Sequence, residues 1–357
     1  MKIKIKTGNF ITFKMANTSE NKVIYNDSFS WFGLIAISEN GGVYQEDSSA
    51  VKIPVSIILA VCLVVSVVGN LCTCAVIVRD RSMRTPTNCY LFNLAITDLT
   101  TTLFIPVEIY LVWAPESYPF GEIGCVIHVL IWDCLSNCSL LTIAAFTVER
   151  YLAVAKPFLR HTLTRKSRVY KIVALNWLVS GCFGIPDMFL IRLHQNKEQS
   201  YCYIIIPFHL KLIMATEMFV FFVMPMTIIF VLYILIAIKI KSIHMFNKTS
   251  PVNGKQYRDK TIRMLAAVAA TFFFCWFPYF LLRLILVTPK QWINHNYNNA
   301  VRALRYVCLA NAYIYTAVNP ILYSLMSRKF SRAFKVSQTV SRRIYTNKNF
   351  PACKQIK

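Results

Sequence analysis

Seven long apolar stretches constrain this chain more than any other feature of its sequence. They lie near residues 53–78, 89–113, 123–155, 169–191, 210–238, 262–287 and 303–325. Each can supply the roughly 20 helical residues that cross about 30 Å of bilayer hydrocarbon. Lipid offers no hydrogen bonds to the backbone, so each stretch is expected to form a helix. The sequence therefore predicts an all-α membrane protein, a bundle of seven transmembrane helices.

The composition supports this interpretation and excludes a second one. Of the 357 residues, 56% are hydrophobic and 15% are charged, whereas a soluble domain carries about 25% charged residues. A net charge of +23 could indicate a nucleic-acid partner. The lysines and arginines lie between the apolar stretches, however, so we predict contact with membrane lipids and no nucleic acid.

The distribution of lysine and arginine predicts the orientation in the membrane. The connections 79–87, 156–171 and 239–263 hold 3, 6 and 7 of these residues, and the tail from 326 holds 9. The alternate connections 114–121, 192–211 and 288–299 hold none, three and one. Positive residues favour the cytoplasmic side. We therefore expect a multi-pass plasma-membrane protein with an extracellular tail over 1–50, a transmembrane domain over 51–325 and a cytoplasmic tail over 337–357.

The predicted outer tail holds two further signals. Asn17-Thr18-Ser19 and Asn26-Asp27-Ser28 match the acceptor sequence for N-glycosylation. Four lysines precede Met15 and disfavour translocation, which leaves Met1 and Met15 as alternative start positions.

Two of the twelve cysteines differ from the others in their predicted location. Cys125 begins the third stretch on the outer side, and Cys202 lies in the outer connection between stretches four and five. Both face the oxidising side of the membrane, where disulfides persist. A disulfide between them is predicted, with two unpaired thiols as the alternative.

Polar residues inside the apolar stretches are candidates for function, because burying them in lipid is costly. Asp98 lies within the second stretch and Asn319 within the seventh. Ser139 lies eleven residues before Arg150, or three helical turns, and shares its face. We expect Asp98, Ser139 and water to hold a sodium ion or a proton. The alternative is that these groups only hydrogen-bond helices together. No other cofactor or metal is predicted.

Two features at the third and sixth stretches suggest a conformational switch. Arg150, in Glu149-Arg150-Tyr151, ends the third stretch, and an arginine costs about 2.5–3.5 kcal/mol at the membrane centre. Pro278 removes a helical hydrogen bond and provides a pivot. Trp276 lies beside this proline and Phe272 one turn before it. The alternative for these aromatic residues is ordinary core packing.

The motifs together resemble the rhodopsin-like (class A) G-protein-coupled receptors over about residues 50–336. They are Gly69-Asn70, Leu94 to Asp98, Cys125, Glu149-Arg150-Tyr151, Trp177, Cys202, Pro225 with Tyr233, Phe272 with Cys275-Trp276-Phe277-Pro278, and Asn319-Pro320-Ile321-Leu322-Tyr323. The resemblance implies a heterotrimeric G protein as partner, and also arrestin. It implies that Glu149 holds Arg150 at rest. On activation Arg150 would turn toward Tyr233 and Tyr323 while the sixth helix swings outward.

A basic segment with two phenylalanines follows the seventh stretch. Phe330 and Phe334 are four residues apart and share a helical face, with cations around them. This pattern predicts an amphipathic helix on the inner membrane surface over 326–336. A disordered basic tail is the alternative.

Charged residues of both signs lie in the predicted outer halves of the helices. The candidates for ligand binding are Glu108, Asp133, Glu217, Arg283 and Arg305. Both signs of charge suit a peptide, since an acidic group can pair with a ligand arginine. The alternative is an internal salt bridge of Asp133 or Glu108 with Arg283.

Within the family, Pro106-Val107-Glu108, the run Thr142 to Tyr151 and the run Asn319 to Ser327 resemble the ghrelin, neuromedin U and pyrokinin receptors. This resemblance implies an amidated neuropeptide with arginine near its C-terminus and coupling to a Gq-type protein. The alternatives are a class A receptor for a non-peptide ligand and a membrane transporter. No motif of a metalloprotease, P-loop or serine-hydrolase enzyme occurs in the sequence, so an enzyme is not predicted.

Overall fold

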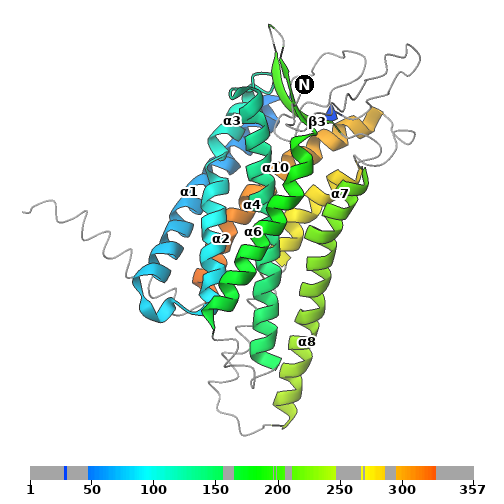
Figure 1. Ribbon diagram of the computed structural model, residues 1–357. Helices are drawn as coiled ribbons and strands as arrows, with labels where there is room; N and C mark the ends of the chain where they lie inside the picture. The colour runs from blue at the N-terminus through cyan, green and yellow to red at the C-terminus, as the bar shows by residue number, and fades with distance from the viewer. Residues whose placement is uncertain are drawn as a thin grey trace, which may run out of the picture.

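A computed structural model describes residues 28–29, 47–155, 165–195, 197, 199–205, 211–246, 267, 270–285 and 295–326. Long helices run side by side through this part of the chain and form one bundle (Figure 1). They are α1 (Ser49–Arg79), α2 (Pro86–Thr102), α3 (Ile105–Trp113), α4 (Gly121–Ala155), α6 (Lys166–Met188), α7 (Lys211–Met218), α8 (Met224–Phe246), the apolar helix Ala270–Ile285 and α10 (His295–Met326). The predicted glycosylation sites at Asn17 and Asn26 lie outside the described residues, and so do residues 327–336 of the amphipathic helix predicted over 326–336.

Five helical segments in the described residues are long and apolar enough to cross a membrane. They are Ser49–Arg79, Pro86–Trp113, Gly121–Ala153, Lys166–Met188 and Leu212–Lys239. The described part of the sixth predicted stretch is the shorter apolar helix Ala270–Ile285, and the seventh lies within α10, which has 32 residues. The predicted all-α membrane fold is confirmed, apart from one small sheet described below.

Helix α1 shows how the bundle places polar and apolar side chains. Ser66, Asn70 and Thr73 are fully buried, whereas Val61 and Val64 are more than half exposed. Their spacing of three and four residues puts the polar groups on one face of the helix. In lipid this arrangement is stable, because apolar side chains suit the hydrocarbon and polar side chains bond between helices.

Two helices are interrupted close to a proline. The second predicted stretch divides into α2 and α3 at Leu103 and Phe104, just before Pro106. The fifth contains a π-helical segment, Phe219–Val223, which ends two residues before Pro225. Proline lacks an N–H and clashes with the preceding turn, so both departures from regular α-helix have an identifiable cause in the sequence.

A three-stranded antiparallel sheet lies at the end of the bundle at which α1 begins (Figure 1). Strands β2 (Ile191–Gln195) and β3 (Ser200–Ile205) form a hairpin, and β1 (Ser28–Phe29) pairs with the other edge of β3. A disulfide joins Cys202 on β3 to Cys125 on α4, which confirms the predicted pairing. These strands were not predicted from the sequence.

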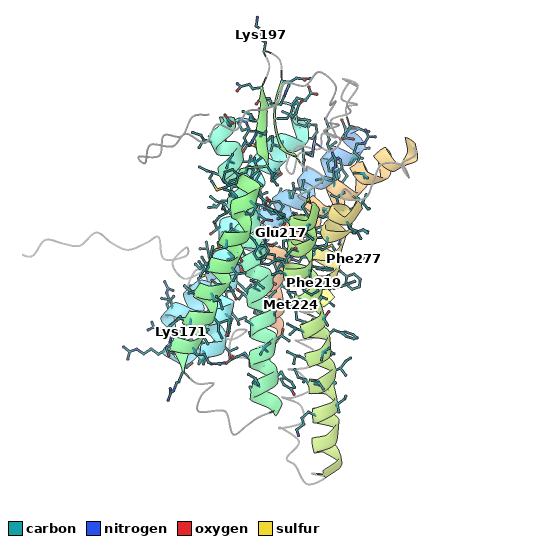
Figure 2. All side chains as sticks on the ribbon, turned by 45° about the vertical axis from the view of Figure 1, so that its right-hand side comes forward. Lys171, Lys197, Glu217, Phe219, Met224 and Phe277 are labelled. Atoms are coloured by element: carbon teal, nitrogen blue, oxygen red, sulfur yellow. A yellow bond between two sulfur atoms is a disulfide. The ribbon has the colours of Figure 1, made fainter. Side chains whose placement is uncertain are left out.

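Helix α4 lies at the centre of the bundle and packs against α2, α6 and α8, while α1 packs against α2 and α10. In Figure 2, Lys197 at the hairpin tip and Lys171 on α6 mark opposite ends of the molecule. Glu217 lies between them in the outer half of the bundle and is buried, so the interior of the helical bundle contains a charged group.

Candidate functional site

A line of buried polar residues connects helices near the middle of the bundle. Asn319 Nδ2 of α10 donates to Asp98 Oδ2 of α2 at 3.0 Å. Asn70 Nδ2 of α1 donates to the Thr316 carbonyl of α10 at 3.1 Å. Asp98, Asn70 and Asn319 are each at most 2% exposed. These bonds join α1, α2 and α10, so the polar groups do at least hold helices together.

Ser139, which the sequence paired with Asp98, has a different direct partner. Its Oγ donates to Thr97 Oγ1 at 2.8 Å, and Thr97 in turn donates to the Leu94 carbonyl. Ser139 thus contacts the residue before Asp98. A sodium ion fits these residues in its chemistry, because the buried Asp98 carboxylate accepts a single amide hydrogen bond and the Ser139 oxygen keeps its lone pairs.

A second buried network links α2, α4 and α6. Trp177 Nε1 donates to Asn93 Oδ1 at 2.9 Å, and Asn93 Nδ2 donates to Thr142 Oγ1 at 3.0 Å. Trp177 belongs to the motifs identified in the sequence, whereas Asn93 was not predicted. An asparagine in a run of apolar residues gives no indication of which neighbour it will meet.

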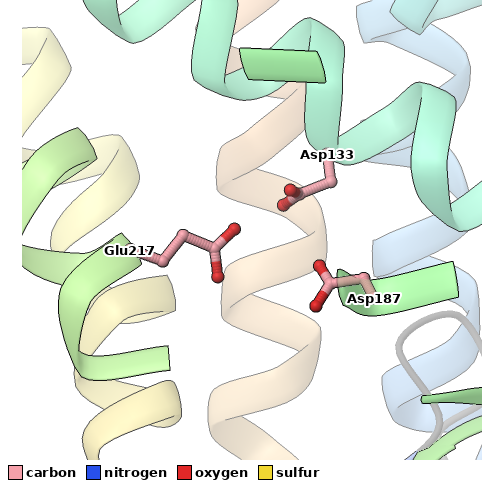
Figure 3. Close-up of side chains that lie close together, drawn as sticks. All are labelled: Asp133, Asp187 and Glu217. Atoms are coloured by element: carbon pink, nitrogen blue, oxygen red, sulfur yellow. The ribbon is translucent and has the colours of Figure 1, made fainter. Parts of the chain in front are cut away.

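Three buried carboxylates converge in the outer half of the bundle. Asp133 comes from α4, Asp187 from the end of α6 and Glu217 from α7, and their side chains point toward one another (Figure 3). One oxygen of each lies within 4.8 Å of the others, and the residues are 3%, 6% and 2% exposed. We call these three residues the outer acidic cluster. Asp187 was not predicted.

One cation and one amide contact this cluster. Arg283 Nη2, from the helix Ala270–Ile285, pairs with Glu217 Oε2 at 2.6 Å. Asn137 Nδ2 donates to Asp133 Oδ2 at 2.9 Å and lies 3.4 Å from Glu217 Oε1. Arg283 therefore does form an internal salt bridge, but with Glu217 and not with Asp133 or Glu108, the partners considered from the sequence. Side-chain rotation and the approach of α7 decide this choice, and neither can be derived from sequence.

Glu108 lies in a separate polar site between α3, α4 and α10. It is fully buried, with His128 Nε2 at 3.9 Å and the Tyr313 hydroxyl at 3.5 Å from its Oε1. His128 Nδ1 lies 3.1 Å from the Tyr118 hydroxyl in the outer loop. Burial and the nearby Glu108 carboxylate raise the pKa of Tyr118, so its hydroxyl stays neutral. Glu108 and Asp133, both named as ligand-binding candidates, thus have different partners and belong to different polar sites.

Arg305, the remaining ligand-binding candidate, is buried on α10. One turn away on the same helix, Arg302 Nε pairs with Asp47 Oδ1 at 3.1 Å, and Tyr306 donates to Asp47 Oδ2 at 2.9 Å. Asp47 directly precedes α1, so this contact ties the start of the bundle to α10.

At the inner end, the structure corrects one expectation. Glu149 was expected to hold its neighbour Arg150, but the ion pair that it forms is with Arg168 of α6. Successive helical residues point about 100° apart, and Glu149 faces α6. The guanidinium of Arg150 lies 5.1 Å from the ring of Phe146. Tyr151 and Tyr233 are half-buried, and Tyr323 is buried.

The predicted aromatic switch residues pack together at the base of the outer half. Trp276 is 3% exposed and meets Trp132 at 6.3 Å and Tyr315 at 5.6 Å between ring centroids. Phe272 is fully buried against Phe222. Pro278 is half-buried in the same helix, and Pro320 lies inside α10. Trp276 therefore contacts α4 through Trp132, the neighbour of Asp133 in the sequence, and contacts α10 through Tyr315.

Comparison with known proteins decides the family. The family described as "7 transmembrane receptor (rhodopsin family)" matches residues 69–323. The chain belongs to the rhodopsin family of seven-transmembrane receptors. This receptor is 32% identical to rat neuromedin-U receptor 2 over 302 residues, which cover 80% of this chain and 75% of the relative. It is also 32% identical to the Drosophila melanogaster pyrokinin-1 receptor, with 81% and 80% covered. The Caenorhabditis elegans neuromedin U receptor homolog nmur-2 is 29% identical, with 80% and 79% covered.

These matches bear on several sequence predictions. The predicted resemblance to rhodopsin-like receptors of the neuromedin U and pyrokinin kind is confirmed. The family consists of receptors rather than enzymes, and its members are multi-pass proteins of the plasma membrane with the N-terminus outside. The roles given to individual site residues remain predictions.

Proposed function

We propose that this receptor binds an extracellular neuropeptide and signals through a heterotrimeric G protein of the Gq type. The relatives carry the names of neuromedin U and pyrokinin receptors, which supports a peptide ligand. The observation that carries the proposal is the buried charge of both signs in the outer half of the bundle, at Asp133, Glu217 and Arg283. An uncharged lipid could not pair with such groups, whereas a peptide supplies charges and amides to match them.

Asp133 is the residue proposed to take a cationic side chain of the peptide. Arg283 is already paired with Glu217, while Asp133 is held by the neutral amide of Asn137. A carboxylate that accepts from a neutral donor keeps most of its charge available to a ligand guanidinium, which binds in a bidentate pair. Glu108 and Arg305 are proposed to contact other parts of the peptide.

Activation is proposed to move the sixth helix outward. Trp276 joins the ligand side of the bundle to this helix through its contacts with Trp132 and Tyr315. Pro278, two residues away, weakens the helix where it would bend. At the inner end Arg150 would then turn toward Tyr233 and Tyr323. The opened inner surface would receive the G protein, and later arrestin, while basic inner segments contact anionic lipids.

Asp98 is proposed to hold a sodium ion or a proton in the resting receptor. An ionised carboxylate that is 2% exposed is unstable in the bundle unless a cation or a proton compensates it. Ser139 and Asn319 would supply further oxygen atoms around the cation.

The test is to express the full chain in cultured cells and to record intracellular calcium against a panel of amidated neuropeptides. We expect a saturable response to one class of peptide, and no response from the Arg150→Ala variant at equal surface expression. Cyclic AMP should be measured in parallel, because it separates Gq coupling from other G proteins. If the wild type reaches the surface and no peptide produces any response in either measurement, the peptide proposal is wrong.

A further inference from the structure

The outer acidic cluster carries more negative charge than its surroundings compensate. Among the side chains that the structure describes, Arg283 is the cation that forms an ion pair with the cluster, and its partner is Glu217. With all three carboxylates ionised, the three acids and one guanidinium would carry an excess of two negative charges. All four residues are at most 6% exposed, and buried charge without compensation is strongly destabilising.

Asp187 adds an independent observation that points to a ligand. Its carboxylate is directed at Asp133 and Glu217 (Figure 3), and the residue is 94% buried, being 6% exposed. In the described part of the chain, no hydrogen bond or ion pair reaches its side-chain oxygens. Buried polar groups in native proteins nearly always have a partner, so the geometry calls for a binding group between these carboxylates.

We propose that Asp133, Asp187 and Glu217 form a binding site for one calcium ion from the extracellular fluid. This inference goes beyond the proposed peptide function and concerns the receptor without peptide, because a peptide guanidinium that pairs with Asp133 would displace the ion. One divalent cation would balance the excess charge of the cluster. Each residue also has an oxygen to offer. Arg283 takes Glu217 Oε2 and Asn137 takes Asp133 Oδ2, which leaves Asp133 Oδ1, both oxygens of Asp187, and Glu217 Oε1 with only the 3.4 Å contact from Asn137 Nδ2.

The donor atoms and their spacing favour calcium over other cations. All of the donors are oxygens, which suit hard cations, whereas zinc and copper prefer nitrogen and sulfur. Calcium binds oxygen at about 2.3–2.6 Å, so two of its ligands lie at most about 5 Å apart. One oxygen of each cluster residue lies within 4.8 Å of the other two. Magnesium requires metal–oxygen distances of about 2.0–2.1 Å and a strict octahedron. The three carboxylates would have to move closer together to bind it.

Asn137 can complete the coordination. Its amide nitrogen bridges Asp133 and Glu217 in this structure. Rotation of the side-chain amide by 180° would exchange nitrogen for oxygen and direct a fourth oxygen ligand at the ion. The same residue would thus serve the site with and without calcium.

Binding can be measured on the purified full-length receptor without any peptide. Terbium, a luminescent ion that takes the same oxygen ligands, should be excited through the nearby indole of Trp132. We expect a saturable luminescence signal that calcium competes away, with half-competition at about 0.1–1 mM, the range of extracellular calcium sites. Calcium should also raise the apparent unfolding temperature in a saturable way, and potassium at equal ionic strength should not.

Two variants make the test specific. Asp187→Asn keeps the side-chain size, so we expect it to fold and to lose both the terbium signal and the calcium-dependent stabilisation. Glu122→Gln neutralises an exposed carboxylate at the outer end of α4, outside the cluster, and should keep both. The proposal is overturned if wild-type receptor shows no calcium-dependent change, or if Asp187→Asn responds like wild type. Neither outcome depends on whether a peptide activates the receptor.

Discussion

At the residue scale, the outer acidic cluster separates two carboxylates that the sequence treats alike. Glu217 forms the ion pair with Arg283 at 2.6 Å, and Asp133 accepts from the amide of Asn137 at 2.9 Å. An ion pair satisfies both of its charges, whereas an amide satisfies only a hydrogen bond. Asp133 is therefore the stronger partner for a cation that arrives from outside, and Glu217 mainly positions Arg283.

The first prediction concerns Asp133→Asn. Removing one member of a buried charge pair with the ligand costs about 2–5 kcal/mol, so peptide potency should fall by roughly 30-fold or more. The measurement is the calcium dose–response at matched surface expression, with the agonist and with an analogue in which citrulline replaces arginine. Wild type should distinguish the two peptides, and Asp133→Asn should not. The proposed pairing of Asp133 with a peptide arginine is wrong if the peptide keeps its full potency at the Asp133→Asn receptor and this variant still prefers the arginine peptide.

The second prediction concerns the disulfide between Cys125 and Cys202. Cys125→Ser should destabilise the receptor by about 2–5 kcal/mol, because the bond holds the β2–β3 hairpin against the outer end of α4. Thermal unfolding of purified protein and antibody staining of intact cells should both report the loss. Cys182→Ser is the matched control, since Cys182 is exposed and unpaired. Equal stability of the two variants would show that the hairpin is held by its hydrogen bonds alone.

At the element scale, close packing of α1 on α10 depends on one glycine. A Cβ atom added at Gly69 would lie 2.6 Å from Pro320 Cγ and 2.8 Å from Pro320 Cβ. Such distances are shorter than any normal contact, and the proline ring cannot move aside without its helix. Gly69 thus lets the backbones approach, as small residues do in membrane bundles. Asn70, the next residue, then reaches the Thr316 carbonyl of α10.

The third prediction follows from this contact. Gly69→Ala should lower stability by about 1–3 kcal/mol, the usual cost of overpacking, although alanine favours helix by itself. Gly181→Ala in α6 is the control, because nothing lies within 4 Å of its added Cβ, and it should be neutral or slightly stabilising. Thermal unfolding of both purified variants in the same detergent tests this. A Gly69→Ala receptor as stable as the Gly181→Ala control would mean that α1 and α10 can separate freely.

The elements also show how far a sequence can predict this structure. Runs of about 20 apolar residues located the helices, because the bilayer dictates their length. Pairings across helices were harder. Asp187 lies beside Pro186 at the end of a helix, where a carboxylate usually meets water, and nothing in the sequence shows that it turns toward Asp133. Arg168 was missed as the partner of Glu149 because helix rotation decides that contact.

At the scale of the whole molecule, buried polar groups connect the outer and inner halves of the bundle. Trp276 contacts Tyr315 on α10, and one turn further along that helix Asn319 binds Asp98 on α2. A cation at Asp98 would stabilise whichever arrangement of α2 and α10 binds it more tightly. If that arrangement is the resting one, sodium lowers the affinity for the agonist. By linkage, the agonist then lowers the affinity for sodium by the same factor.

The fourth prediction tests this linkage. Agonist affinity in membranes should be lower in sodium chloride than in N-methylglucamine chloride at equal ionic strength, by about 5-fold or more. Asp98→Asn should abolish the difference, because a neutral amide removes the charge that attracts sodium. Glu122→Gln, at an exposed carboxylate on the outer end of α4, should keep it. A sodium effect that survives in Asp98→Asn would place the ion elsewhere. No sodium effect in wild type would leave a proton as the charge that compensates Asp98, and agonist affinity should then depend on pH in wild type but not in Asp98→Asn.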